Sequence, residues 1–167
     1  KGADVWKTRS GYHILTDRFA PSKGSPFEGT VCTNLKKYCG GTWKGIEQNL
    51  DYIKGMGFDA IWISPVVKNV DNPNPTLGDG YHGYWTKDFE RLNNVWGSEK
   101  DLKRLVQSAH AKGILVMVDV VINHSGYMKY DEVKKDFKYL DIVPFNKKEY
   151  YHPLCEINDW YDPWQLE

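Results

Sequence analysis

The sequence predicts an α/β protein in which parallel strands alternate with amphipathic helices. A long apolar run, rich in β-branched residues, lies between Gly113 and Ser125. Two stretches with apolar residues at helical spacing precede this run, and each of them ends at a glycine. Strands that alternate with helices in this way pair in parallel through right-handed crossovers, because the helices must pack back onto the sheet.

The first strand and the first helix are predicted in the N-terminal third. Residues 11–15 (GYHIL) are typical of a short strand, and the loop after it runs to position 41. Thr42 is a suitable helix N-cap, and Gly57 fits the C-terminal stop. The apolar positions of this helix are Ile46, Leu50, Ile53 and Met56.

The second strand and the second helix follow in the same order. Residues 60–64 (AIWIS) are predicted as a strand that Pro65 halts. Ser98 opens the second helix, and Asp101 three residues later gives a weaker version of the capping box. Gly113 ends the helix. The apolar face of this helix consists of Leu102, Leu105, Val106 and Ala109.

The third predicted strand carries the residues with most chemical potential. Residues 114–124 (ILVMVDVVINH) form an apolar run that delivers an aspartate, an asparagine and a histidine toward its C-terminal end. A run of this kind predicts a strand buried on both faces, as in parallel sheets covered by helices. Because α/β barrels keep their active sites at the C-terminal ends of strands, these polar residues are candidates for a functional site.

Composition and charge argue against several classes of partner. The 167 residues carry 22 basic and 22 acidic side chains, so the formal net charge is zero. Without a basic patch or an acidic tail, the chain is expected to bind neither nucleic acid nor a membrane. No apolar stretch reaches the roughly 18 residues that a membrane span requires. The N-terminus lacks a signal-peptide core, so we expect any such peptide to have been removed.

Five stretches of the chain together resemble the α-amylase family, glycoside hydrolase family 13, and in particular secreted fungal α-amylases. DVVINH at 119–124 resembles the third-strand motif of that family. The other stretches are YHILTDRFA at 12–20, YCGGTW at 38–43, LDYIKGMGFDAIWISP at 50–65 and GYHGYW at 80–85. The resemblance implies a secreted, endo-acting retaining hydrolase of α-1,4-glucosidic bonds in starch and related glucans.

The resemblance also implies a (β/α)₈ TIM barrel, for which this chain is too short. Such a barrel needs roughly 250 residues, so residues 1–124 are expected to form the first three strands of the catalytic barrel, domain A. Residues 125–167 are then the beginning of domain B. The family places its nucleophile, acid/base and third aspartate after later strands, so all three are expected beyond Glu167. The expected partners are α-glucan and the remainder of the barrel, and the chain alone is predicted to be inactive.

Four residues are expected to bind substrate by this resemblance. Tyr84 would stack on the glucose at subsite −1, and His82 and Trp85 would shape the pocket beside it, because sugar C–H faces stack on aromatic rings. His124 would hydrogen-bond the same glucose. From composition alone, residues 80–85 are more simply an aromatic cluster that anchors a loop, and His124 is a structural histidine.

Calcium is the expected cofactor, again by resemblance. The family holds this ion between the barrel and domain B with an asparagine that corresponds to Asn123, and fungal members add an acidic ligand that would be Glu167. Calcium takes six to eight oxygen ligands, and amide and carboxylate oxygens are typical donors. Asp119 is expected either to brace an arginine near the nucleophile or to be a structural carboxylate, because a buried carboxylate needs a partner.

The three cysteines fit a secreted chain. Cys32 and Cys39 flank a short polar loop and are expected to close it as a disulfide, with two free thiols as the alternative. Cys155 is left over, and the resemblance pairs it with a cysteine beyond Glu167.

Two alternative functions remain open. Another member of the family, such as a glucanotransferase or an α-glucosidase, would have the same strands and would differ at its acceptor subsites. A complete, non-catalytic α/β domain that binds glucan or a partner protein would fold alone as a monomer, and Cys155 would need no partner.

Overall fold

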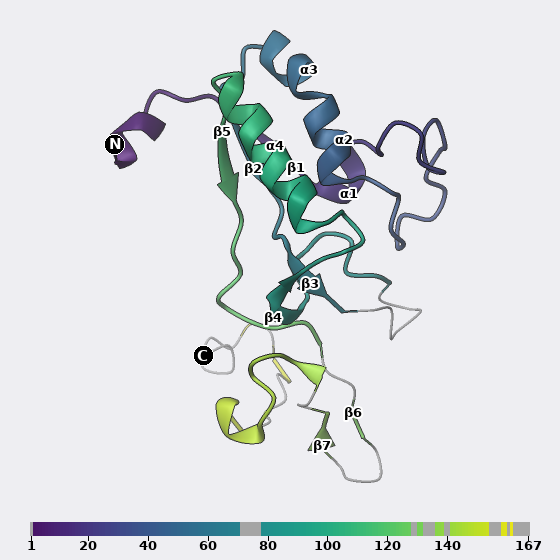
Figure 1. Ribbon diagram of the computed structural model, residues 1–167. Coiled ribbons are helices and arrows are strands. Elements are labelled where there is room, and N and C mark those ends of the chain that lie inside the picture. The colour runs from purple at the N-terminus through teal and green to yellow at the C-terminus, as the bar shows by residue number, and fades with distance from the viewer. Residues whose placement is uncertain are drawn as a thin grey trace.

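The centre of the fold is a three-stranded parallel sheet with the strand order β1–β2–β5 (Figure 1). The computed structural model describes residues 2–70, 78–127, 130–131, 136–138, 141–153, 158–159 and 161. The strands are β1 (Gly11–Ile14), β2 (Ala60–Ile63) and β5 (Leu115–Val118). Helices separate the successive strands of this sheet, which confirms the predicted α/β class with parallel pairing.

Three helices pack against one face of the sheet and enclose the core (Figure 1). They are α2 (Trp43–Gln48), α3 (Leu50–Gly55) and α4 (Glu99–Ala111). Alternate strand residues point to opposite faces, and Ile14, Ile61 and Ile63 share the helix-covered face, where each is at most 1% exposed. The core also contains Trp43, Ile46, Leu50, Ile53, Trp96, Leu105, Ala109 and Ile114.

The predicted helix caps are present. Thr42 accepts a hydrogen bond from the Gly45 backbone N–H at 2.9 Å, and Ser98 forms a complete capping box with Asp101. Gly57 has a φ of 90°, a left-handed conformation that glycine adopts readily after a helix. These residues end and begin the helices as the sequence predicts.

The single helix predicted between Thr42 and Gly57 is divided at Asn49. This residue has φ −114° and ψ 15°, outside the helical region. Its side-chain Nδ2 donates to the Gly45 carbonyl at 2.8 Å. Asparagine side chains compete with the backbone for such hydrogen bonds, which explains the break. Met56, predicted on the apolar face, is exposed.

The third strand is shorter and less buried than predicted. β5 has four residues, and the Asp119 N–H just after it donates to the Ile63 carbonyl at 3.0 Å. Val120 and Ile122 are 71% and 94% exposed, so the prediction of a strand buried on both faces is wrong. The neighbouring strand β2 stops before Pro65, which has no N–H to extend the ladder. Among the described residues, no strand pairs with the other edge of β5.

An antiparallel hairpin lies between the second strand and the second helix, where the sequence indicates only a loop. It pairs β3 (Val67–Asn69) with β4 (Thr86–Leu92). The buried side chains of β4 are the polar residues Thr86 and Asp88. The apolar alternation that identifies most strands is therefore missing from this one.

The chain beyond β5 returns to this hairpin. Val143 exchanges two backbone hydrogen bonds of 2.9 Å with Lys87 and Phe89 of β4, and Ile142 beside it is buried. The remaining elements are α1 (Thr16–Phe19), η1 (Ala3–Trp6), β6 (Tyr130–Asp131), β7 (Asp136–Phe137) and η3 (Lys148–Tyr150). In the part of the chain that the structure describes, no helix is long and apolar enough to cross a membrane. The domain boundary after residue 124 stays a prediction.

Candidate active-site residues

The C-terminal side of the parallel sheet brings together three of the predicted site residues. Tyr84 donates its hydroxyl hydrogen to Asp119 Oδ2 at 2.8 Å. His124 Nε2 lies 3.0 Å from the Tyr84 carbonyl oxygen. Tyr84 belongs to the loop before β4, whereas Asp119 and His124 follow β5. Residues from two distant parts of the sequence therefore meet where α/β barrels place their active sites.

The Tyr84 hydroxyl is held as a hydrogen-bond donor. Burial, followed by the hydrogen bond to the Asp119 carboxylate, raises the pKa of Tyr84 to about 12. The phenol is therefore neutral at physiological pH, and its hydrogen is committed to Asp119. The ring face is then the part of Tyr84 available to a ligand. Asp119 is half-buried, and its expected contact with an arginine stays a prediction.

His82 and Trp85 form an aromatic wall beside Tyr84. The Tyr84 N–H donates to His82 Nδ1 at 2.9 Å, and the two rings are stacked at 5.9 Å with an angle of 18° between planes. Trp85 meets the His82 ring edge-on at 4.5 Å. Because Nδ1 accepts a hydrogen bond, the neutral His82 ring carries its hydrogen on Nε2. Burial, followed by the charge of Arg18, lowers the pKa of His82 and favours this neutral form.

The Asn69 side chain fixes the backbone of residues 80–85, the aromatic loop, and this role is not predicted from the sequence. Its buried side chain donates to the Gly83 carbonyl at 3.1 Å and accepts the Trp85 N–H at 2.7 Å. A Cβ at Gly80 would lie 2.8 Å from the Asn69 Cβ, so glycine is required there. Pairing between a side chain and a loop backbone has no periodic pattern, and no signal in the sequence points to Asn69.

Asn123 and His124 lie on exposed chain after β5. Asn123 Nδ2 is 3.2 Å from His124 Nδ1. Within the described ranges, no group of three or more His, Cys, Asp or Glu side chains is placed to hold a metal ion. Glu167, the other predicted ligand, lies outside the described residues, as does Cys155. Calcium binding by Asn123 and Glu167 stays a prediction.

Cys32 and Cys39 form a disulfide with Cα atoms 5.4 Å apart, which confirms the predicted bridge. The buried carboxylate of Asp17 holds the same loop, because it accepts the N–H groups of Cys39 at 2.9 Å and of Gly40 at 3.3 Å. Burial raises the pKa of Asp17, although these hydrogen bonds and the charge of Arg18 oppose the shift. Neither Asp17 nor Arg18 is predicted from the sequence as a functional residue. Their position directly after β1 is the signal that could have identified them. The polar residues that directly follow β5 belong to the candidate site in the same way.

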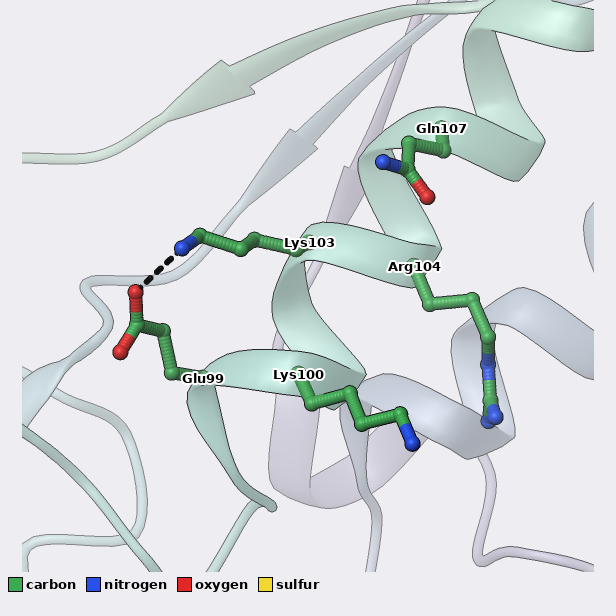
Figure 2. A pocket seen from close by; sticks show the side chains of 5 residues that line it. All are labelled: Glu99, Lys100, Lys103, Arg104 and Gln107. Carbon is green, nitrogen blue, oxygen red and sulfur yellow. Dashed lines mark ion pairs between the residues drawn. The ribbon is translucent and has the colours of Figure 1, made fainter.

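Two surface hollows differ in their relation to these residues. One of about 560 Å³ adjoins His124 and lies between residues 120–125 and residues 145–152. The other, of about 400 Å³, lies on the outer surface of α4 (Figure 2). It is lined by Glu99, Lys100, Lys103, Arg104 and Gln107. Figure 2 shows the ion pair of 2.5 Å between Glu99 and Lys103. Because such pairs are common on exposed helix surfaces, this second hollow gives no sign of a functional site.

Comparison with known proteins identifies the family. The family model "Alpha amylase, catalytic domain" matches residues 13–165. The chain belongs to the α-amylase family. Alpha-amylase 3 of Schizosaccharomyces pombe is 48% identical over 155 residues, which are 93% of this chain and 27% of the relative.

Solved structures of α-amylases share the fold of this chain. The alpha-amylase from Malbranchea cinnamomea has a TM-score of 0.83 and 44% identity, over 98% of this chain and 33% of that protein. The Geobacillus thermoleovorans alpha-amylase, solved in complex with acarbose, has a TM-score of 0.72 and 40% identity, over 97% and 31%. The chain therefore spans about a third or less of the proteins it matches. Its sheet and helices correspond to a part of a TIM barrel, as the sequence predicts.

Proposed function

We propose that this chain is the N-terminal part of a secreted, calcium-dependent α-amylase that cleaves internal α-1,4-glucosidic bonds of starch with retention. The observation that carries this proposal is the position of Tyr84, fixed between Asp119 and His124 beside the C-terminal ends of the strands. In a chain of the α-amylase family, this is where an aromatic ring can stack on a sugar.

The open face of the sheet supports the view that the barrel is completed by further strands. His13, Trp62 and Met117 are aligned across the three strands, and all three are exposed. A row of large side chains on one face of a parallel sheet is what a barrel strand contributes to the barrel interior. We assign the nucleophile and the acid/base to the remainder of the barrel.

The substrate contacts in this proposal follow from the hydrogen bonds and ring contacts that each side chain makes within the chain. Tyr84 offers its ring face, and His82 and Trp85 keep that ring in place. His124 has Nε2 on the Tyr84 carbonyl and Nδ1 beside the Asn123 amide. A glucose hydroxyl that binds His124 would replace one of these two contacts.

Of the two predicted calcium ligands, the structure describes Asn123, and its side chain is chemically suited to calcium. Asn123 is exposed, and its contact with His124 uses the amide nitrogen and not the amide oxygen. A neutral amide oxygen suits calcium, which needs several more oxygen ligands. We assign Asn123 and Glu167 to this site, where the ion would tie the end of the third strand to domain B.

Product analysis of the full-length protein tests the proposal. The substrate is a maltooligosaccharide blocked at its non-reducing end, and proton NMR follows the anomeric form of the new reducing ends. We expect internal cleavage with α-anomeric products that later mutarotate. β-Anomeric first products, or no cleavage, would contradict the proposal. Transfer products at low substrate concentration would instead favour a glucanotransferase.

A further inference from the structure

Arg18 lies where three segments of the chain meet. It belongs to α1, directly after β1, and its Nε is 2.9 Å from Asp17 Oδ2. Its Nη2 donates to the carbonyl oxygens of Leu35 at 2.8 Å and Lys37 at 2.9 Å. Both carbonyls belong to the loop that the disulfide closes. The edge of the guanidinium group therefore joins the first strand to the disulfide loop.

The face of the same guanidinium group contacts the aromatic loop. Arg18 Cζ lies 3.7 Å from the centroid of the Tyr81 ring, a cation–π contact. The Tyr81 ring meets the His82 ring edge-on at 5.1 Å. His82 in turn accepts the Tyr84 N–H and stacks on its ring. An unbroken series of contacts thus runs from Arg18 to Tyr84.

We propose that Arg18 is a positioning residue that fixes residues 80–85 against the disulfide loop, so that Tyr84 and His82 are in place before sugar binds. Pre-organisation of this kind improves affinity because less ordering remains to be done on binding. The inference rests on the proposed function of Tyr84 and extends it to a residue that does not itself contact substrate.

The geometry requires arginine at this position. A planar guanidinium group can bind two carbonyls through its edge while its face lies on a ring. A lysine ammonium keeps the charge beside Asp17 but cannot hold both contacts, since it is a single compact donor group. Arg18→Lys therefore separates positioning from charge compensation. If Arg18 only balances the charge of Asp17, lysine at position 18 should restore sugar affinity. If Arg18 positions the aromatic loop, lysine should not restore it.

Arg9 provides a matched control at the other end of β1. Its Nη1 is 2.9 Å from Asp59 Oδ2, the same separation as in the Arg18 pair. Its hydrogen-bond partners are Val5 and Asp59, and neither belongs to the disulfide loop or to the aromatic loop. Arg9→Met therefore removes an ion pair of the same length, although a more exposed one, without touching residues 80–85.

The test measures the affinity of the full-length protein for acarbose by calorimetry, well below the unfolding midpoint of each variant. We expect Arg18→Met and Arg18→Lys each to raise Kd about tenfold, a change of about 1.4 kcal/mol, and Arg9→Met to change it less than about twofold. A Kd for Arg18→Lys equal to that of the unaltered protein would overturn the inference.

A double-mutant cycle with Tyr81→Leu locates the effect. If Arg18 acts through Tyr81, Arg18→Met should change Kd less than about twofold in the Tyr81→Leu background. Fully additive effects would overturn the inference. Should the Arg18 variants fail to fold, Tyr81→Leu alone decides: about a tenfold loss supports positioning, and an unchanged Kd contradicts it. An unaltered protein that neither binds acarbose nor cleaves glucan would refute the proposed function, a result distinct from any of these.

Discussion

The two faces of the three-stranded sheet are built from alternate residues of the same strands, yet they differ in how far helices cover them. On one face, Ile14, Ile61 and Ile63 are at most 1% exposed beneath α2, α3 and α4. Only Val118, at the end of β5, is exposed on the helix-covered face. On the other face, Trp62 and Met117 are 38% and 42% exposed. Both faces carry large apolar side chains, with His13 beside Trp62 on the open face, so composition alone does not explain the difference. The difference is that, among the described residues, helices pack against only one of the two faces.

This contrast bears on the proposal that the chain is one part of a larger barrel. A sheet with one face meant for water carries polar residues on that face. Here His13 and Trp62 stack at 4.3 Å in the middle of the uncovered face, beside Met117. The open face is therefore suited to contact with further protein. In a barrel, that contact is made by the side chains of the remaining strands.

The largest expected effects come from truncating one residue on each face in the full-length protein. Ile61→Ala should cost about 2–5 kcal/mol in the free energy of unfolding, because the site is fully buried. If the open face is the barrel interior, Trp62→Ala should cost a similar amount, about 3–5 kcal/mol. Urea unfolding with matched m-values measures both.

Trp6→Ala is the matched control for this comparison. Trp6 is 39% exposed in η1, nearly the same as Trp62, but it lies outside the sheet. Its truncation should cost no more than about 0.5–1 kcal/mol. A Trp62→Ala cost as small as that of Trp6→Ala would mean that the face stays open, as in a complete and independent domain.

The next effect concerns the loop beside the candidate site. Replacing Cys32 and Cys39 together with serine should lower the free energy of unfolding by about 2–3 kcal/mol in the chain-entropy model. Peptide mapping without reduction should recover the two cysteines in one linked species. Two free thiols in secreted protein would show that the bridge does not form there.

Substitutions of Tyr84 test the candidate site itself, and their expected effect on kcat/KM is intermediate in size. Tyr84→Ala should lower kcat/KM about tenfold or more, since each 1.4 kcal/mol of lost transition-state binding is tenfold. Tyr84→Phe should cost less because it keeps the ring face, although it removes the hydrogen bond to Asp119. Small and equal losses from both variants would leave Tyr84 with a role in loop structure alone.

The smallest expected effect is a shift in the response to calcium. A ligand that binds only the folded state stabilises it by RT ln(1 + [L]/Kd), so the Tm of the full-length protein should rise with calcium. Asn123→Ala removes one ligand, and the same rise should then need much more calcium. If both proteins melt alike across the titration, after trace metal is chelated, Asn123 is not a ligand.

Apolar periodicity and caps predict the helix-covered face well. Leu105 and Ala109 are buried as their spacing in α4 indicates, and Ser98 caps that helix. The break at Asn49 is not predicted, because a local side-chain hydrogen bond leaves the apolar spacing unchanged. The burial of the third strand is overestimated, since an apolar pattern shows which residues avoid water and not what covers them.

The candidate site is predicted less completely. The resemblance to the family singles out Tyr84, Asp119 and His124, and the structure brings these three together. Asn69 and Arg18, which hold the aromatic loop, are not predicted, because their partners are backbone groups and a ring distant in sequence. Contacts of that kind become visible only when the chain is folded.

The most direct test of the central claim compares residues 1–167 alone with the full-length protein on one blocked maltooligosaccharide. The claim is that this chain supplies part of the sugar site and that the catalytic carboxylates lie in the rest of the barrel. It predicts cleavage by the full-length protein and none by residues 1–167 at equal concentration. Cleavage by residues 1–167 that persists after controls for contaminating amylase would contradict it, and so would an inactive full-length protein.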